Sequence, residues 1–183
     1  ICCLRSFLKA ESISVCYFYS SRLQKKVNAL FEQIDFDVLF CFSSPMAEYY
    51  FRSTHKNRAV KPLIRIMDLI DVDSYKWTQY AEQSSGLKRL IYRHEACYLS
   101  QYEHRIAETF DHLLVVSEQE KNIFLRGLAA TNLSVVTNGV DLDFFNPRHT
   151  QRQQAQKRTL VFTGVMDYWP NIEGVQWFVE RVF

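Results

Sequence analysis

Four short apolar segments, separated by helical patterns, constrain the fold of this chain more than any other feature. They occupy residues 37–42, 62–67, 112–116 and 133–137. A near-continuous apolar run such as residues 37–42 is typical of a strand that is covered on both faces in a parallel sheet. The sequence therefore predicts an α/β fold, with a Rossmann-like parallel sheet and helices on both of its faces.

The segments between these strands carry helical periodicity. A helix is expected over residues 20–34, and its predicted buried stripe consists of Leu23, Val27, Leu30, Phe31 and Ile34. A long helix is expected over residues 86–110, in which Glu95 and Glu103 lie mostly off the apolar stripe. Residues 12–19 could instead form a short extended piece.

Polar residues follow the first predicted strand. Ser43 and Ser44 come directly after it, before the short helix expected at residues 46–52. A serine at this place can cap the helix, and this structural role is favoured over contact with a ligand.

Three aspartates follow the second predicted strand, namely Asp68, Asp71 and Asp73. Carboxylates so close together repel one another unless they are solvated, hydrogen-bonded or used in a reaction, and open α/β sheets bind ligands at this edge. We expect Asp73 or Ser74 to cap the next helix. Asp68 or Asp71 is the candidate for a functional role, for example as a base.

The segment 160–171 predicts a strand, a glycine turn and a helix start. Leu160 begins a short apolar run that Gly164 ends, and Pro170 and Asn171 suit the first turn of a helix. A helix N-terminus beside a glycine turn can bind phosphate, although an ordinary βα turn has the same pattern. The dinucleotide and P-loop glycine fingerprints are both absent.

Composition narrows the function. The 183 residues carry 22 Lys and Arg against 20 Asp and Glu, which gives nucleic-acid binding little support. The five cysteines are scattered without a C-x-x-C pair, and the histidines lack metal-ligand spacing, so neither a disulfide framework nor a metal site is expected. No apolar run approaches the roughly 18 residues of a membrane span, which leaves peripheral membrane association open.

The ends of the chain suggest a fragment. The sequence begins without methionine and stops inside the helical pattern that Asn171 opens. The Asn138-Gly139 pair predicts a tight turn after the fourth strand. We expect one domain over residues 1–150, a polar linker over 151–158, and the beginning of a second domain over 159–183.

A family resemblance is carried by residues 42–47, 68–77, 110–111 with 116–118, 138–141 and 161–171. The Asp-Val-Asp-Ser and Met-Asp-Tyr-Trp-Pro-Asn sequences within them are the most specific. In these segments the chain resembles retaining glycosyltransferases of the GT-B fold, family 4, close to the exopolysaccharide-associated sugar transferases. The resemblance implies two Rossmann-like domains that face a cleft, with the acceptor on the first and the nucleotide sugar on the second.

The resemblance also implies roles for particular residues. Gly164 would face the donor phosphates with Asn171 beside it in the donor site, and Asp68 falls where many relatives place a histidine, which makes Asp71 the alternative catalytic residue. Ser43, Ser44 and Asp73 would be acceptor-side or structural residues. Asn138, Gly139 and Asp141 would lie near the interdomain hinge.

The implied reaction transfers a sugar, with retention, from a nucleoside diphosphate sugar to a hydroxyl of a saccharide or lipid-linked acceptor. No cofactor or metal is expected, because helix N-termini and basic side chains can meet the diphosphate charge. The implied location is the cytoplasm, including the inner face of the membrane, and the chain alone should be inactive. The alternative is a non-catalytic Rossmann-type nucleotide-binding module.

Overall fold

The computed structural model describes residues 6–7, 9–53, 62–128, 130–146 and 160–183. The chain forms two compact units, which divide between Gly139 and Val140. The linker expected at residues 151–158 lies outside the described residues.

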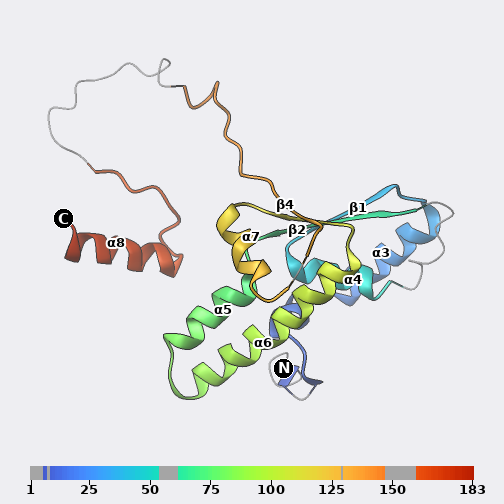
Figure 1. Ribbon diagram of the computed structural model, residues 1–183, viewed down its shortest axis with the longest axis horizontal. Coiled ribbons are helices and arrows are strands. Elements are labelled where there is room, and N and C mark those ends of the chain that lie inside the picture. The colour runs from blue at the N-terminus through green and yellow to red at the C-terminus, as the bar shows by residue number, and fades with distance from the viewer. Residues whose placement is uncertain (1–5, 8, 54–61, 129, 147–159) are drawn as a thin grey trace. The chain divides into compact units, whose positions relative to one another are not determined.

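The first unit is built on a four-stranded parallel sheet (Figure 1). Its strands stand in the order β1-β2-β3-β4. They span Val38–Phe42, Ile64–Ile70, His112–Val115 and Leu133–Val135. All four segments predicted as strands therefore form one parallel sheet, which confirms the α/β class.

The described helices of this unit connect the strands or precede them. They are α2 (Ile13–Phe18), α3 (Ser21–Gln33), α4 (Ala47–Phe51), α5 (Asp73–Glu82), α6 (Gly86–Thr109) and α7 (Glu118–Leu125), with a 3-10 turn, η1, at Ser44–Met46. The predicted limits of α3 and α6 are correct to within one residue. The extended piece expected at residues 12–19 is wrong, because this segment forms α2.

The connecting helices lie on one face of the sheet only (Figure 1). Each crossover from β1 to β4 moves to the next strand in the same direction. Right-handed crossovers that keep one direction place all their helices on the same side. In the described part of this unit, the expectation of helices on both faces is therefore wrong.

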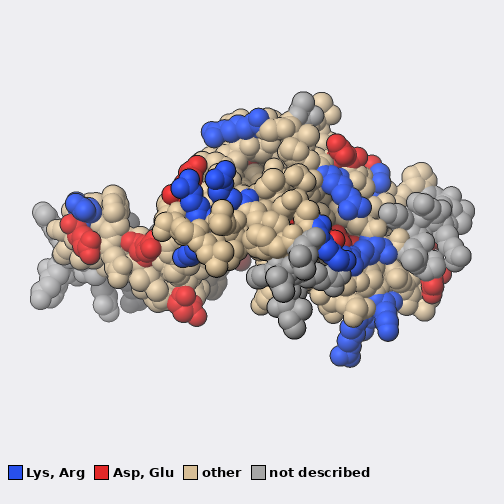
Figure 2. Space-filling view, turned by 90° about the horizontal axis from the view of Figure 1, so that it is seen from below, with Lys and Arg blue, Asp and Glu red and all other residues tan. Residues whose placement is uncertain are grey.

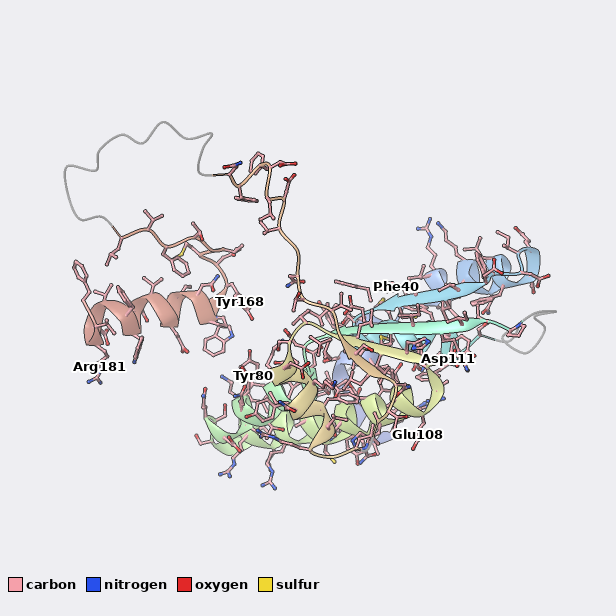
Figure 3. The ribbon with its side chains drawn as sticks, turned by 45° about the horizontal axis from the view of Figure 1, so that its top comes forward. Phe40, Tyr80, Glu108, Asp111, Tyr168 and Arg181 are labelled. Carbon is pink, nitrogen blue, oxygen red and sulfur yellow. The ribbon has the colours of Figure 1, made fainter. Side chains whose placement is uncertain are left out.

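The strand side chains reflect this one-sided arrangement. Met67, Leu69 and Leu113 point to the helices and are fully buried in the core. On the opposite side, called the open face, β1 contributes Val38, Phe40 and Phe42, and their partners in β2 are Ile64, Ile66 and Asp68. Phe40 and Phe42 remain 54% and 59% exposed, and Figure 3 shows Phe40 on the side of β1 away from α5 and α6.

Helix α3 is buried through only part of the predicted stripe: Phe31 packs against the core, as expected. Leu23 and Leu30 are exposed, whereas Gln24 is buried. The Gln24 side chain donates from Nε2 to the backbone oxygen of Tyr49 in α4, at 3.0 Å. The predicted apolar stripe is thus wrong in this part, because α3 is attached to its neighbour by a hydrogen bond rather than by its leucines.

Two carboxylates on α6 are buried, although the periodicity placed them off the apolar stripe. Glu95 accepts hydrogen bonds from Ser12 Oγ (2.8 Å), Ile13 N (2.5 Å) and Ser14 N (3.0 Å). It therefore satisfies the free N–H groups at the start of α2, which explains why this β-favouring segment is helical. Glu103 does the same for the start of α5.

The second unit contains helix α8 (Trp169–Arg181), with Pro170 in its first turn as expected. Residues 160–163 form no strand. The predicted strand is wrong here, because a strand is stable only when a neighbour pairs with its backbone groups, and no described residue does so.

Candidate functional site

The strongest candidate site in the first unit is the carboxyl edge of β1 and β2. The two strand ends are joined there by a hydrogen bond of 2.8 Å from Ser43 N to the backbone oxygen of Asp68. Open parallel sheets bind their ligands at this edge. Of the polar residues predicted as a site, Ser43 and Asp68 are joined by this bond, Ser44 follows Ser43, and Asp71 follows the end of β2.

The backbone at this edge is strained. Ser43 has φ 71° and Ile70 has φ 66°, and Ala10 is the only other non-glycine residue with positive φ in the described chain. For a β-branched residue such as Ile70 this conformation is an outlier. Strain of this kind is of order 1–3 kcal/mol per residue and gathers at binding and catalytic sites.

Asp68 supports the strained segment. It lies inside β2 rather than after it, since the strand continues to Ile70. Its Oδ1 accepts a hydrogen bond from Ile70 N at 3.1 Å, where the register with β3 shifts. One carboxylate oxygen thus stabilises the backbone where the register shifts. The side chain points to the open face, and its second oxygen makes no hydrogen bond to the described residues.

Ser44 places a hydroxyl beneath this edge. Its side chain is only 2% exposed, and its Oγ has no hydrogen-bond partner among the described residues. A buried hydroxyl without a partner is unfavourable, so its place in a folded protein calls for an explanation such as a bound ligand or water. Neither Ser43 nor Ser44 caps the following helix through its side chain, which contradicts that prediction.

Asp71 and Asp73 flank the start of α5. Lys76 Nζ lies 3.9 Å from Asp71 and 3.0 Å from Asp73. Asp71 remains half exposed, so a reactant can reach its carboxylate. Asp73 is the first residue of the helix, where a negative charge is favourable beside the helix dipole, but it does not cap it.

The caps of α5 come instead from glutamates distant in the sequence. Glu120 Oε2 accepts from Val72 N at 2.7 Å, while Glu103 accepts from both the backbone N–H and the hydroxyl of Ser74. The predicted cap by Asp73 or Ser74 is therefore wrong. Ser117 does cap α7, because its Oγ accepts from Glu120 N at 3.1 Å.

Glu103 is the titratable group that periodicity missed. Burial raises the pKa of Glu103 from an ordinary 4.5 to about 7. Its hydrogen bonds with Ser74 lower the pKa, whereas the nearby Asp73 and Glu120 raise it further. Its spacing from Glu95, eight residues along one helix, was the available signal. Both carboxylates lie on the face that packs against other helix starts.

The predicted donor residues belong to the second unit. Asn171 Nδ2 donates to the backbone oxygen of Val165 at 2.9 Å and closes the turn around Gly164. Gly164 has no positive φ, and a Cβ there would lie 2.9 Å from atoms of Asn171 and Phe162. A larger residue at this position would therefore require the ends of the Asn171 and Phe162 side chains to move.

The predicted hinge residues lie around the division between the units, which falls after Gly139. The tight turn expected at Asn138-Gly139 occurs three residues later. Asp141 Oδ1 accepts there from the backbone N–H groups of Asp143 and Phe144, at 3.0 and 2.9 Å. The turn is set by the Asp141 side chain rather than by the glycine.

Within the described residues, no group of three or more His, Cys, Asp or Glu is arranged to hold a metal. None of the described helices has the length and apolar character needed to span a membrane. Comparison of the chain with family models, curated proteins and solved structures yields no match.

Proposed function

We propose that this chain carries the acceptor side of a retaining glycosyltransferase, which moves a sugar from a nucleoside diphosphate sugar to a hydroxyl of a saccharide or lipid-linked acceptor. The observation that carries the proposal is the strained edge of β1 and β2, where two non-glycine residues with positive φ flank Asp68. The motif resemblance to GT-B transferases adds the reaction class.

The edge offers the groups that an acceptor hydroxyl needs. The carboxylate of Asp71 is half exposed and can accept a proton, and Lys76 Nζ lies 3.9 Å from its Oδ2. The free oxygen of Asp68 can bind a further hydroxyl of a saccharide. In the transfer, the acceptor oxygen bonds to the anomeric carbon as the bond to the diphosphate breaks.

Asp68 and Asp71 have different expected roles. Asp68 is already used to hold Ile70, so we assign it to positioning of the edge and binding of acceptor hydroxyls. The only polar contact of the Asp71 side chain within the described residues is the long one with Lys76, at 3.9 Å. We therefore assign the proton-accepting role to Asp71.

The test uses the complete gene product that contains these residues, supplied with a panel of nucleoside diphosphate sugars and saccharide acceptors. Asp71→Asn should lower kcat by roughly 100-fold or more if the carboxylate accepts the proton. Asp35→Asn is the matched control, because Asp35 is exposed and precedes the opposite end of β1. Full transfer activity in the Asp71 variant would refute its catalytic role.

A second measurement separates transfer from simple nucleotide binding. A protein that binds nucleoside diphosphates but transfers no sugar from any donor of the panel would be the non-catalytic Rossmann-type module instead. Asp68→Asn keeps an oxygen that can accept from Ile70 N, so that variant should fold normally and lose acceptor affinity.

A further inference from the structure

A separate pocket of about 510 Å³ lies among α2, α4 and α6, on the helix side of the sheet. Its lining includes aromatic and charged side chains, among them Tyr19, Glu48, Arg52, Tyr98, Tyr102 and Arg105. Tyr98, Gln101, Tyr102 and Arg105 follow one another at spacings of three, one and three along α6, which puts them on one face of that helix. None of these residues has a role in the proposed sugar transfer.

The acidic side chain of Glu48 is neutralised inside the pocket. Its Oε1 accepts from Arg52 Nε at 2.5 Å, and its Oε2 accepts from the hydroxyl of Tyr102 at 3.0 Å. Burial and the neighbouring Glu48 raise the pKa of Tyr102, so its hydroxyl stays protonated and donates. Both oxygens of Glu48 are therefore occupied.

Arg105 is the uncompensated charge of the pocket. Its guanidinium stacks on the ring of Phe51, 4.0 Å from the centroid, which fixes its plane. No carboxylate of the described residues lies within salt-bridge distance of it. Glu11 also lines the pocket, and it is exposed like Arg105, so water screens both charges and an anion gains most from direct hydrogen bonds to the guanidinium.

The attraction for an anion is local. On the face shown in Figure 2, basic and acidic side chains are interspersed rather than gathered by sign. A polyanion would find no broad positive surface on that face. A single planar carboxylate, in contrast, matches the two parallel N–H groups of one guanidinium.

The remaining lining suits a sugar ring. Tyr98 offers aromatic surface to C–H groups, whereas the Tyr19 ring is already in contact with the Arg52 guanidinium and with Tyr49. Gln101 offers both a donor and an acceptor to hydroxyls. The volume falls within the usual range of small-molecule sites, about 300–1,000 Å³. The pocket is also near the candidate site, because Ser44 and Glu48 are four residues apart along the continuous segment of η1 and α4.

We propose that this pocket binds a carboxylate-bearing sugar residue, with Arg105 holding the carboxylate, and that it selects acidic saccharides as acceptors. The second half of the proposal rests on the proposed transferase function. The binding half stands on the pocket alone.

The test titrates the protein, without any donor, with an oligosaccharide that contains glucuronate and with the same oligosaccharide containing glucose in its place. Calorimetry or saturation-transfer NMR should show the acidic compound binding at least about 10-fold more tightly, as expected for one hydrogen-bonded charge pair. Arg105→Gln should remove this preference. Arg93→Gln should keep it, because Arg93 is exposed on the same helix and does not line the pocket.

Three results would overturn the proposal: equal affinity for the two oligosaccharides, an Arg105 variant that keeps the preference, or an equal loss in the Arg93 variant. Competition by inorganic phosphate at equal concentration would show a general anion site and would also overturn it. Thermal melting checks the fold, and Arg105→Lys serves if the glutamine variant unfolds, since it keeps the charge and loses the planar fork.

Different results would refute the proposed transferase function and the proposed pocket. A protein that prefers glucuronate through Arg105 but transfers no sugar would retain the pocket and lose the transferase assignment. A transferase whose Arg105→Gln variant uses acidic acceptors with unchanged KM would retain the function and lose the pocket.

Discussion

The buried carboxyl of Glu103 predicts a pH dependence of stability that can be tested with one substitution. Glu103 is 2% exposed and accepts two hydrogen bonds from Ser74 at the start of α5. Its pKa is about 7 in the folded chain, against 4.5 for an ordinary glutamate. Glutamine keeps the shape and an accepting oxygen, but it cannot ionise.

The sign follows from the proton balance. Below pH 4.5 the carboxyl is protonated in both the folded and the unfolded chain, so it causes no pH dependence there. Between pH 4.5 and about 7 the unfolded chain loses the proton while the folded chain keeps it, so the free energy of unfolding falls as pH rises. A difference of roughly 2.5 between the two pKa values corresponds to about 3 kcal/mol over this window.

Urea unfolding at a series of pH values between 4.5 and 7.5 measures the effect. The difference in unfolding free energy between Glu103→Gln and the parent chain should grow in favour of the variant by about 3 kcal/mol across the window. Glu108→Gln is the control for loss of a charge, since Glu108 is exposed on the same helix (Figure 3). A difference that stays constant with pH would refute the raised pKa of Glu103.

Two further predictions concern helix starts. Glu95→Ala should destabilise the chain by about 1–3 kcal/mol, because it leaves the N–H groups of Ile13 and Ser14 without acceptors. Hydrogen exchange should be accelerated first in α2. Unchanged protection of α2 would contradict the capping role of Glu95. Gly164→Val should weaken binding of a nucleoside diphosphate, measured by calorimetry in excess chelator, whereas Gly174→Ala should not, since a Cβ at Gly174 meets nothing within 4 Å. Undiminished affinity in a folded Gly164→Val variant would remove this turn from the donor site, and binding lost with chelator would contradict the metal-free expectation.

The sequence predicted the elements of the first unit well because their signals are local. The apolar run of β1 and the long periodic segment of α6 mark their own limits, whereas β2 continues to Ile70, beyond its apolar run. Helix α2 is different, since its residues favour extended structure and its start is satisfied by Glu95, 81 residues or more away. No local pattern contains that contact.

The candidate site was predicted in its place but not in its detail. The rule that ligands bind at the carboxyl ends of parallel strands led to Ser44, Asp68 and Asp71. The positive φ of Ser43 and Ile70 was not predictable, because neither residue type favours that conformation; at Ile70 it coincides with a shift in the register between β2 and β3. The buried glutamates were missed for a related reason, since periodicity assigns carboxylates to solvent unless distant N–H groups are known to need them.

The exposed face of the sheet gives the last prediction, because sequence and structure disagree about it most clearly. The apolar run that contains Phe40 indicates burial on both faces, and truncating a buried phenylalanine costs about 3–5 kcal/mol. In the structure Phe40 is 54% exposed, whereas Met67 in the next strand has no exposed surface. The strand order explains the difference, since it places every connecting helix on the Met67 side.

Phe40→Ala should therefore reduce the free energy of unfolding by less than about 1.5 kcal/mol, roughly the share of its apolar surface that is buried. Met67→Ala should reduce it by about 2–5 kcal/mol, as in other well-packed cores. Urea unfolding of the two variants under the same conditions measures both losses of unfolding free energy. Equal losses would mean that the Phe40 side of the sheet is covered in solution, and the one-sided arrangement of helices would then be incomplete as an account of what stabilises β1.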